Sequence, residues 1–145
     1  MTSLQRLFCR YRDEQRGSSA AEFAIIAPVF LLMLFGMLAY AIYFGAAHSV
    51  QQLAADAVRT SIAGLSATER DALVSAFITN NAGDYLLLDP THLDYEIGDK
   101  EEDSNQYRVT VTYDASDLPI WNLQVPLPLP DHIITFTSTI RLGGI

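Results

Sequence analysis

A glycine and a glutamate stand close together just before the longest apolar run of the sequence. Ser18 follows Gly17, and Glu22 is the fifth residue after the glycine. A carboxylate at the edge of an apolar helix is costly to bury, and such groups tend to be functional when they have a partner. Cleavage after Gly17 would create one, because the new ammonium of Ser18 could pair with Glu22 of a neighbouring helix. Alternatively, Glu22 only marks the start of the helix, at the positive end of its dipole.

The remaining polar residues form no catalytic or metal-binding motif. The three histidines, His48, His92 and His132, have no cysteine and no HExxH-like spacing near them. The acidic run 99–103 lacks the ligand spacing and the turn glycine of an EF-hand loop, and a solvated turn explains it better. We therefore expect no catalytic residue, no metal site and no cofactor.

The apolar run is long enough to cross a membrane. No charged residue occurs from Phe23 to Ala47. At a rise of about 1.5 Å per residue, such a helix exceeds the roughly 30 Å hydrocarbon core of a bilayer. It is also longer than the apolar stretch of a secretory signal peptide, which has about 7–15 residues. The sequence predicts one membrane-spanning helix, in which Pro28 either produces a kink or is tolerated without one.

The charge distribution predicts the orientation of this helix. Residues 1–17 carry four arginines against two acidic residues, whereas residues 48–145 carry five basic and fourteen acidic residues within a net charge of −8. Arginines that flank a membrane span stay on the cytoplasmic side. The short N-terminus should therefore lie in the cytoplasm and the C-terminal part outside, in a bacterial periplasm. The acidic balance also argues against nucleic-acid binding, which needs basic groups for the phosphates.

Two helical segments are expected beyond the membrane. The long helix continues to about Ala63 as an amphipathic extension, and Gly64 is its expected C-cap. Ser66 and Glu69 then have the spacing of a capping box, which begins a short second helix. The apolar stripe of that helix contains Leu73, Val74, Phe77 and Ile78.

The rest of the chain has the alternating pattern of strands. Residues 93–97 and 107–113 should pair as a hairpin around a polar turn, and residues 133–142 should form a third strand. The proline-rich segment 118–130 cannot be a central strand, because proline lacks the donor for a ladder hydrogen bond. It is expected to be a loop or an extended edge.

These elements predict an α+β fold. A long N-terminal transmembrane helix extends into a small head with one short helix and a three-stranded antiparallel sheet. Residues 1–17 are expected to be a leader, and residues 18–65 the long helix, with the membrane span at residues 23–47. Residues 66–145 form the expected head.

The N-terminal segment resembles that of TadE-like proteins, which are minor pilins or pseudopilins of the tight-adherence (Flp) pilus system. The resembling stretch begins at Arg12 and reads RDEQRGSSAAEFAIIAPVFLLMLFGMLAYAIYFG. The match includes the basic leader, Gly17, Glu22 with Phe23 after it, and the Ala-Pro pair at Pro28. The following QQLAADAVRTSIAGL resembles the helix extension of these proteins, and ITFTSTIRL resembles their terminal strand.

The resemblance implies that a prepilin peptidase cuts after Gly17 on the cytoplasmic side, and that Glu22 acts in processing, assembly or both. It also implies a set of partners: the peptidase, other minor pilins, the major Flp pilin, the inner-membrane assembly platform and the lipid bilayer. Ser18 and Ala21 differ from the residues that are commoner at these positions. TadF-like proteins are similar in size and are the alternative within the same system.

Three classes of function follow from these observations. The first is a processed, single-pass minor pilin of the inner membrane that acts in pilus initiation, assembly or capping, and so in adhesion. The second is an unprocessed membrane anchor whose acidic head binds an outside ligand. The third is an outside hydrolase, which would need a clustered catalytic site that the sequence does not display. Removal of residues 1–17 distinguishes the first class from the second.

Overall fold

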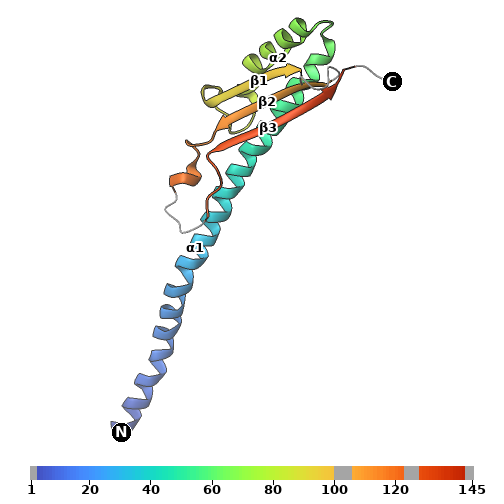
Figure 1. Cartoon of the computed structure of the whole chain (residues 1–145). Coiled ribbons are helices and arrows are strands. Elements are labelled where there is room, and N and C mark those ends of the chain that lie inside the picture. The colour runs from blue at the N-terminus through green and yellow to red at the C-terminus, as the bar shows by residue number, and fades with distance from the viewer. Residues whose placement is uncertain (1–2, 100–105, 123–127, 143–145) are drawn as a thin grey trace. The chain divides into compact units, whose positions relative to one another are not determined.

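The computed structural model contains a long helix, a short helix and a three-stranded sheet (Figure 1), which confirms the predicted α+β class. It describes residues 3–99, 106–122 and 128–142, with side chains from Ser19 onward. The elements are α1 (Ser3–Thr60), α2 (Ala67–Asn81), β1 (Leu93–Asp99), β2 (Gln106–Asp114) and β3 (Ile133–Arg141). The chain divides into two compact units, residues 1–38 and residues 39–145.

Helix α1 begins at Ser3, so the predicted start near Ser19 is wrong. The residues before Gly17 are mostly good helix formers such as leucine, glutamine, arginine and glutamate, and they include no proline. One glycine in a helix costs only about 1 kcal/mol. Gly17 therefore does not separate a non-helical leader from the apolar helix.

The C-terminal end of α1 depends on a close approach to α2. After Thr60 the chain makes a 3-10 turn over Ser61–Ala63, and the Gly64 N–H donates to the Ser61 carbonyl at 3.1 Å. Gly64 thus ends the helical segment as predicted, but its φ of −82° is open to any residue. A Cβ atom on Gly64 would lie 2.6 Å from Cγ and 2.8 Å from the backbone nitrogen of Arg70. The position excludes larger residues for lack of space.

A Gly64→Ala variant is therefore expected to have a lower free energy of unfolding, by about 1–3 kcal/mol. The Arg70 side chain can move away from the new methyl group, but the backbone of α2 cannot without repacking. The matched control is Gly98→Ala on β1, where nothing lies within 4 Å of the added Cβ. Urea unfolding of both variants in detergent micelles measures the difference. Equal stabilities would contradict the steric explanation.

The predicted capping box of α2 is present. The Ser66 hydroxyl accepts a hydrogen bond from the Glu69 N–H at 3.2 Å, and the Glu69 carboxylate accepts from the Leu65 N–H at 2.8 Å. The return bond thus goes to the residue before the N-cap instead of the N-cap itself. Of the predicted apolar stripe, Val74 and Ile78 are fully buried. The box fixes the first turn of α2 while these two side chains hold the helix on the core.

The sheet has the order β1-β2-β3 with both pairs antiparallel. The register aligns Val111 of β2 with Tyr95 of β1 and with Phe136 of β3, so the predicted apolar faces lie together. One face of β2 is buried through its four apolar residues, Tyr107, Val109, Val111 and Tyr113. Most of the predicted hairpin turn, residues 100–105, lies outside the described residues.

The core of the second unit joins this sheet face to the second half of α1. Val50, Leu53 and Ala57 of α1 are buried in the same cluster as the β2 side chains and Ile78 of α2. Figure 1 shows the sheet lying along this part of α1. The compact unit starts at Ala39, and the predicted head, residues 66–145, lies within it.

Candidate functional site in the N-terminal helix

The first unit has an apolar helix surface that is exposed. The large exposed side chains are Phe23, Ile25, Ile26, Val29, Phe30, Leu31, Leu32, Met33, Leu34, Phe35, Met37 and Leu38. The segment Ser19–Ala63 is long and apolar enough to cross a membrane, and only 11% of its most apolar window is buried inside the structure. The core helix of a soluble protein would be mostly buried. The segment is therefore consistent with a membrane anchor.

Glu22 and Phe23 lie at the start of this exposed surface, and the side chains of both residues are exposed. Because α1 begins at Ser3, Glu22 does not lie in the first turn of the uncut chain. The favourable effect of the helix dipole falls off within about one turn of the helix end. The alternative interpretation, in which Glu22 marks the helix start, thus does not fit the full-length chain.

The predicted cleavage site and the proline also lie within α1. The backbone of Gly17 and Ser18 is helical, and their side chains lie outside the described part of the chain. Helix α1 continues through Pro28 without a break in its assignment. Pro28 is exposed, so its ring lies on the same apolar surface as the side chains around it.

The apolar run changes its environment at Ala39. Ala39 and Ala46 are buried in the second unit, and Ile42 packs against the same core. The predicted span of residues 23–47 includes these residues, because hydropathy does not distinguish a lipid-facing side chain from one that faces a sheet. The part of the predicted span that lies before the second unit, residues 23–38, has a helical length of roughly 24 Å, somewhat less than the roughly 30 Å of a hydrocarbon core.

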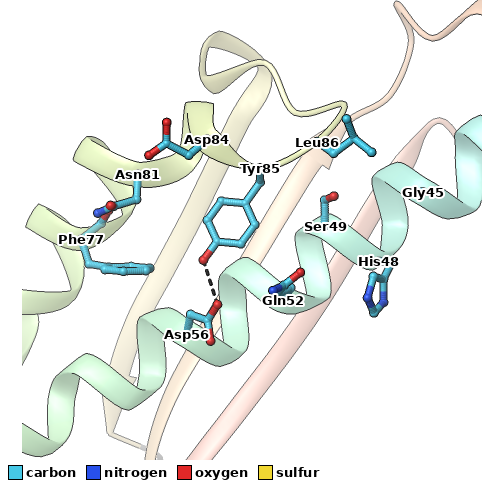
Figure 2. A pocket seen from close by; sticks show the side chains of 10 residues that line it. All are labelled: Gly45, His48, Ser49, Gln52, Asp56, Phe77, Asn81, Asp84, Tyr85 and Leu86. Atoms are coloured by element: carbon cyan, nitrogen blue, oxygen red, sulfur yellow. Dashed lines mark hydrogen bonds between the residues drawn. The ribbon is translucent and has the colours of Figure 1, made fainter.

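The second unit contains an open cavity of about 660 Å³ beside α1 (Figure 2). The α1 side of the cavity is lined by Gly45, His48, Ser49, Gln52 and Asp56. The opposite side is lined by Phe77, Asn81, Asp84, Tyr85 and Leu86 from α2 and the turn after it. Sequence reasoning missed this cavity, since no local pattern connects the two sets of residues.

The contact that crosses the cavity is structural. The Tyr85 hydroxyl donates to Asp56 at 2.9 Å (Figure 2). Arg59 also binds Asp56, at 2.8 Å. Burial raises the pKa of Tyr85 to about 12, and the Asp56 carboxylate adds to this shift. At neutral pH the phenol therefore keeps its proton, and its hydrogen bond to Asp56 holds the turn after α2 against α1. It has no tendency to release a proton for acid–base chemistry.

A Tyr85→Phe variant is expected to lose about 1 kcal/mol of folding stability at neutral pH, because the hydrogen bond disappears. In the wild type, the stability should also fall as the pH rises from 10 to about 12, because the unfolded tyrosine ionises first. This decline should be smaller in the variant. Urea unfolding at pH 7 and pH 11 measures both effects. Tyr95→Phe on β1 is the control, and a similar result for the two variants would refute the role of Asp56.

The other candidate residues are not brought together. His48 lines the cavity, His92 lies 3.4 Å from the Asp117 carboxylate, and His132 stacks on Trp121 with ring centroids 3.8 Å apart. In the described ranges, no group of three or more His, Cys, Asp or Glu residues is placed to hold a metal ion. Residues 100–103 of the acidic run lie outside those ranges.

One segment of the chain contains Glu22, the exposed apolar surface of α1 and the buried residues Ala39 and Ala46. Residues 17–59 match the family model of TadE-like proteins. The resemblance inferred from the sequence is confirmed over these residues, and it indicates a protein associated with the tight-adherence pilus. The TadE-like segment includes both Glu22 and the part of α1 that packs against the sheet.

The TadE-like match does not extend to the rest of the second unit. Helix α2 and all three strands lie beyond residue 59, so the resemblance of ITFTSTIRL to the terminal strand of the family stays a prediction. No curated protein and no solved structure matches the chain.

Proposed function

We propose that this chain is a minor pilin of a tight-adherence pilus, cut by a prepilin peptidase after Gly17. The observation that carries the proposal is the TadE-like match over residues 17–59, which contains Glu22 and the exposed apolar surface. A subunit of this kind acts by packing its helix against other pilin helices. No catalytic activity is proposed for it.

The exposed surface between Phe23 and Leu38 is suited to helix packing inside a bilayer or a filament. In lipid, helices associate through van der Waals packing, close approach at small residues and interhelical hydrogen bonds. Gly36 is buried, and Ala27 is half-buried among exposed neighbours. Most of the assembly energy should come from the large apolar side chains, and Glu22 should select the register, because a buried charge specifies better than it stabilises.

The proposed topology follows from the charges. The arginines before Gly17 hold the N-terminus in the cytoplasm, so the protein crosses the inner membrane once and its second unit lies in the periplasm. Its proposed partners are the peptidase, other minor pilins, the major pilin and the assembly platform. A folded unit from Ala39 onward is bulky beside a very small helical pilin. This bulk favours a role in initiating or capping the pilus, and so in adhesion.

The competing proposal is an unprocessed anchor that presents its second unit to an outside ligand. The cavity beside Tyr85 would then be the place to look for that ligand. The hydrogen bond between Tyr85 and Asp56 crosses this cavity and has a structural role. The cavity therefore supports a ligand-binding function less strongly than the TadE-like match supports a minor pilin.

Intact mass and N-terminal sequencing separate the two proposals. The protein is purified from membranes of cells with and without a functional prepilin peptidase. A mature chain that begins at Ser18 only in the presence of the peptidase is the expected result. A Met1 start in both strains would overturn the pilin proposal and leave the unprocessed anchor.

A further inference from the structure

The proline-rich loop before β3 contacts α1 at the point where the second unit begins. The Tyr40 hydroxyl donates to the Pro128 carbonyl, and the Tyr43 hydroxyl donates to the Asp131 carbonyl at 3.2 Å. Figure 1 shows the segment that leads into β3 lying beside α1. Tyr40 comes two residues after Leu38, the last residue of the first unit. The loop therefore contacts the first two turns of α1 within the second unit.

Some of the backbone polar groups of this loop are absent or already hydrogen-bonded. Pro128 and Pro130 have no N–H group, and the carbonyls of Pro128 and Asp131 accept the two tyrosine hydroxyls. A backbone group without a hydrogen-bond partner is costly to bring toward the hydrocarbon, where no water can bind it. Two missing donors and two bonded carbonyls lower that cost for a loop at the edge of the membrane.

The same region exposes apolar and aromatic side chains. Phe44 is 63% exposed and Leu129 is 43% exposed. The Phe44 ring centroid lies 6.0 Å from that of Tyr40 and 5.9 Å from that of Tyr43, so three aromatic rings are grouped on α1. Tyrosine is enriched where membrane helices pass from hydrocarbon to water, because its ring is apolar and its hydroxyl is polar.

We propose that residues 128–131, with Tyr40, Tyr43 and Phe44, rest in the headgroup layer of the outer leaflet and set the height of the second unit above the membrane. The occupant of this surface is lipid. This inference rests on the proposed function, because it requires α1 to span the bilayer. Counted from Phe23, the first residue after the Glu22 carboxylate, roughly 30 Å of helix ends near Ile42, which brings the aromatic group to the outer edge of the hydrocarbon core.

Spin labels at three exposed positions test this proposal in the full-length chain. In a Cys9→Ser background, Leu129→Cys, Leu65→Cys and Phe30→Cys each receive a nitroxide, and the proteins are reconstituted in phosphatidylcholine vesicles. Oxygen collects in the bilayer and a neutral nickel chelate stays in water, so the ratio of the two collision rates reports depth. We expect this ratio to be highest at position 30, intermediate at 129 and lowest at 65, because Leu65 is 94% exposed and follows the C-terminal end of α1.

Three outcomes would overturn the proposal, and they are distinguishable. If position 129 has the same ratio as position 65, the loop is in water while α1 still spans the bilayer. If position 129 is shielded from both reagents, another protein chain covers it. If position 30 itself is in water, the membrane span fails, and the proposed function fails with it. A second labelled variant, Asp131→Cys, keeps the backbone carbonyl that accepts from Tyr43. It should give the same depth as position 129 if the label at 129 has not disturbed the loop.

Discussion

A Gly17→Phe variant is expected to keep residues 1–17 in cells that have a functional prepilin peptidase. Glycine lets another backbone approach closely, and a bulky side chain next to the cut bond would block that approach. Because the proposed partner of Glu22 is the new ammonium of Ser18, pilus formation should be lost together with cleavage. Intact mass spectrometry of the membrane-bound protein measures the retained segment, and electron microscopy of the cells measures the pili.

The matched control for this variant is Gly98→Phe. Gly98 is on β1 in the second unit, and nothing lies within 4 Å of a Cβ added there. This control carries the same glycine-to-phenylalanine change far from the cleavage site, so it should be cut normally. A Gly17→Phe protein that begins at Ser18 would show that the peptidase does not depend on this glycine.

A Glu22→Ala variant should remain in the membrane but fail to enter a pilus. The exposed apolar surface that follows Glu22 is unchanged in the variant, so membrane insertion is preserved. Removing one partner of a buried ion pair costs about 3–5 kcal/mol, which corresponds to an approximately 100-fold or greater loss of association. Immunoblots of sheared pili and of membranes from the same cells measure the two fractions.

Two further variants test whether the charge of Glu22 is what matters. Glu22→Gln keeps the shape and the hydrogen-bonding capacity of the side chain, so it should fail like Glu22→Ala if the carboxylate pairs with an ammonium. Glu96→Ala removes an exposed carboxylate from β1 and should assemble normally. Normal incorporation of Glu22→Ala into pili would refute a role for this residue in assembly.

Local patterns were enough to predict most of the secondary structure. Alternation defined the buried face of β2 through Val109 and Val111, and the spacing of Ser66 and Glu69 defined the start of α2. Each of these signals comes from residues that are neighbours in the sequence. The long helix was predicted to start at residue 18, whereas α1 starts at Ser3, because the charged segment and the glycine before residue 18 are tolerated in a helix.

The sequence by itself determined the apolar helix, its charge asymmetry, the TadE-like segment with Glu22, and the α+β class of the rest. Only the tertiary structure decided which part of the apolar run faces the protein. Ala39 and Ala46 have the same hydropathy whether they face lipid or protein, and only the packing of the second unit shows that they are buried in its core. The bonds of Tyr40 and Tyr43 to the proline loop were equally hidden, because they join residues that are 88 positions apart. Contacts of that range leave no periodic pattern in a sequence, since the fold alone brings the two segments together.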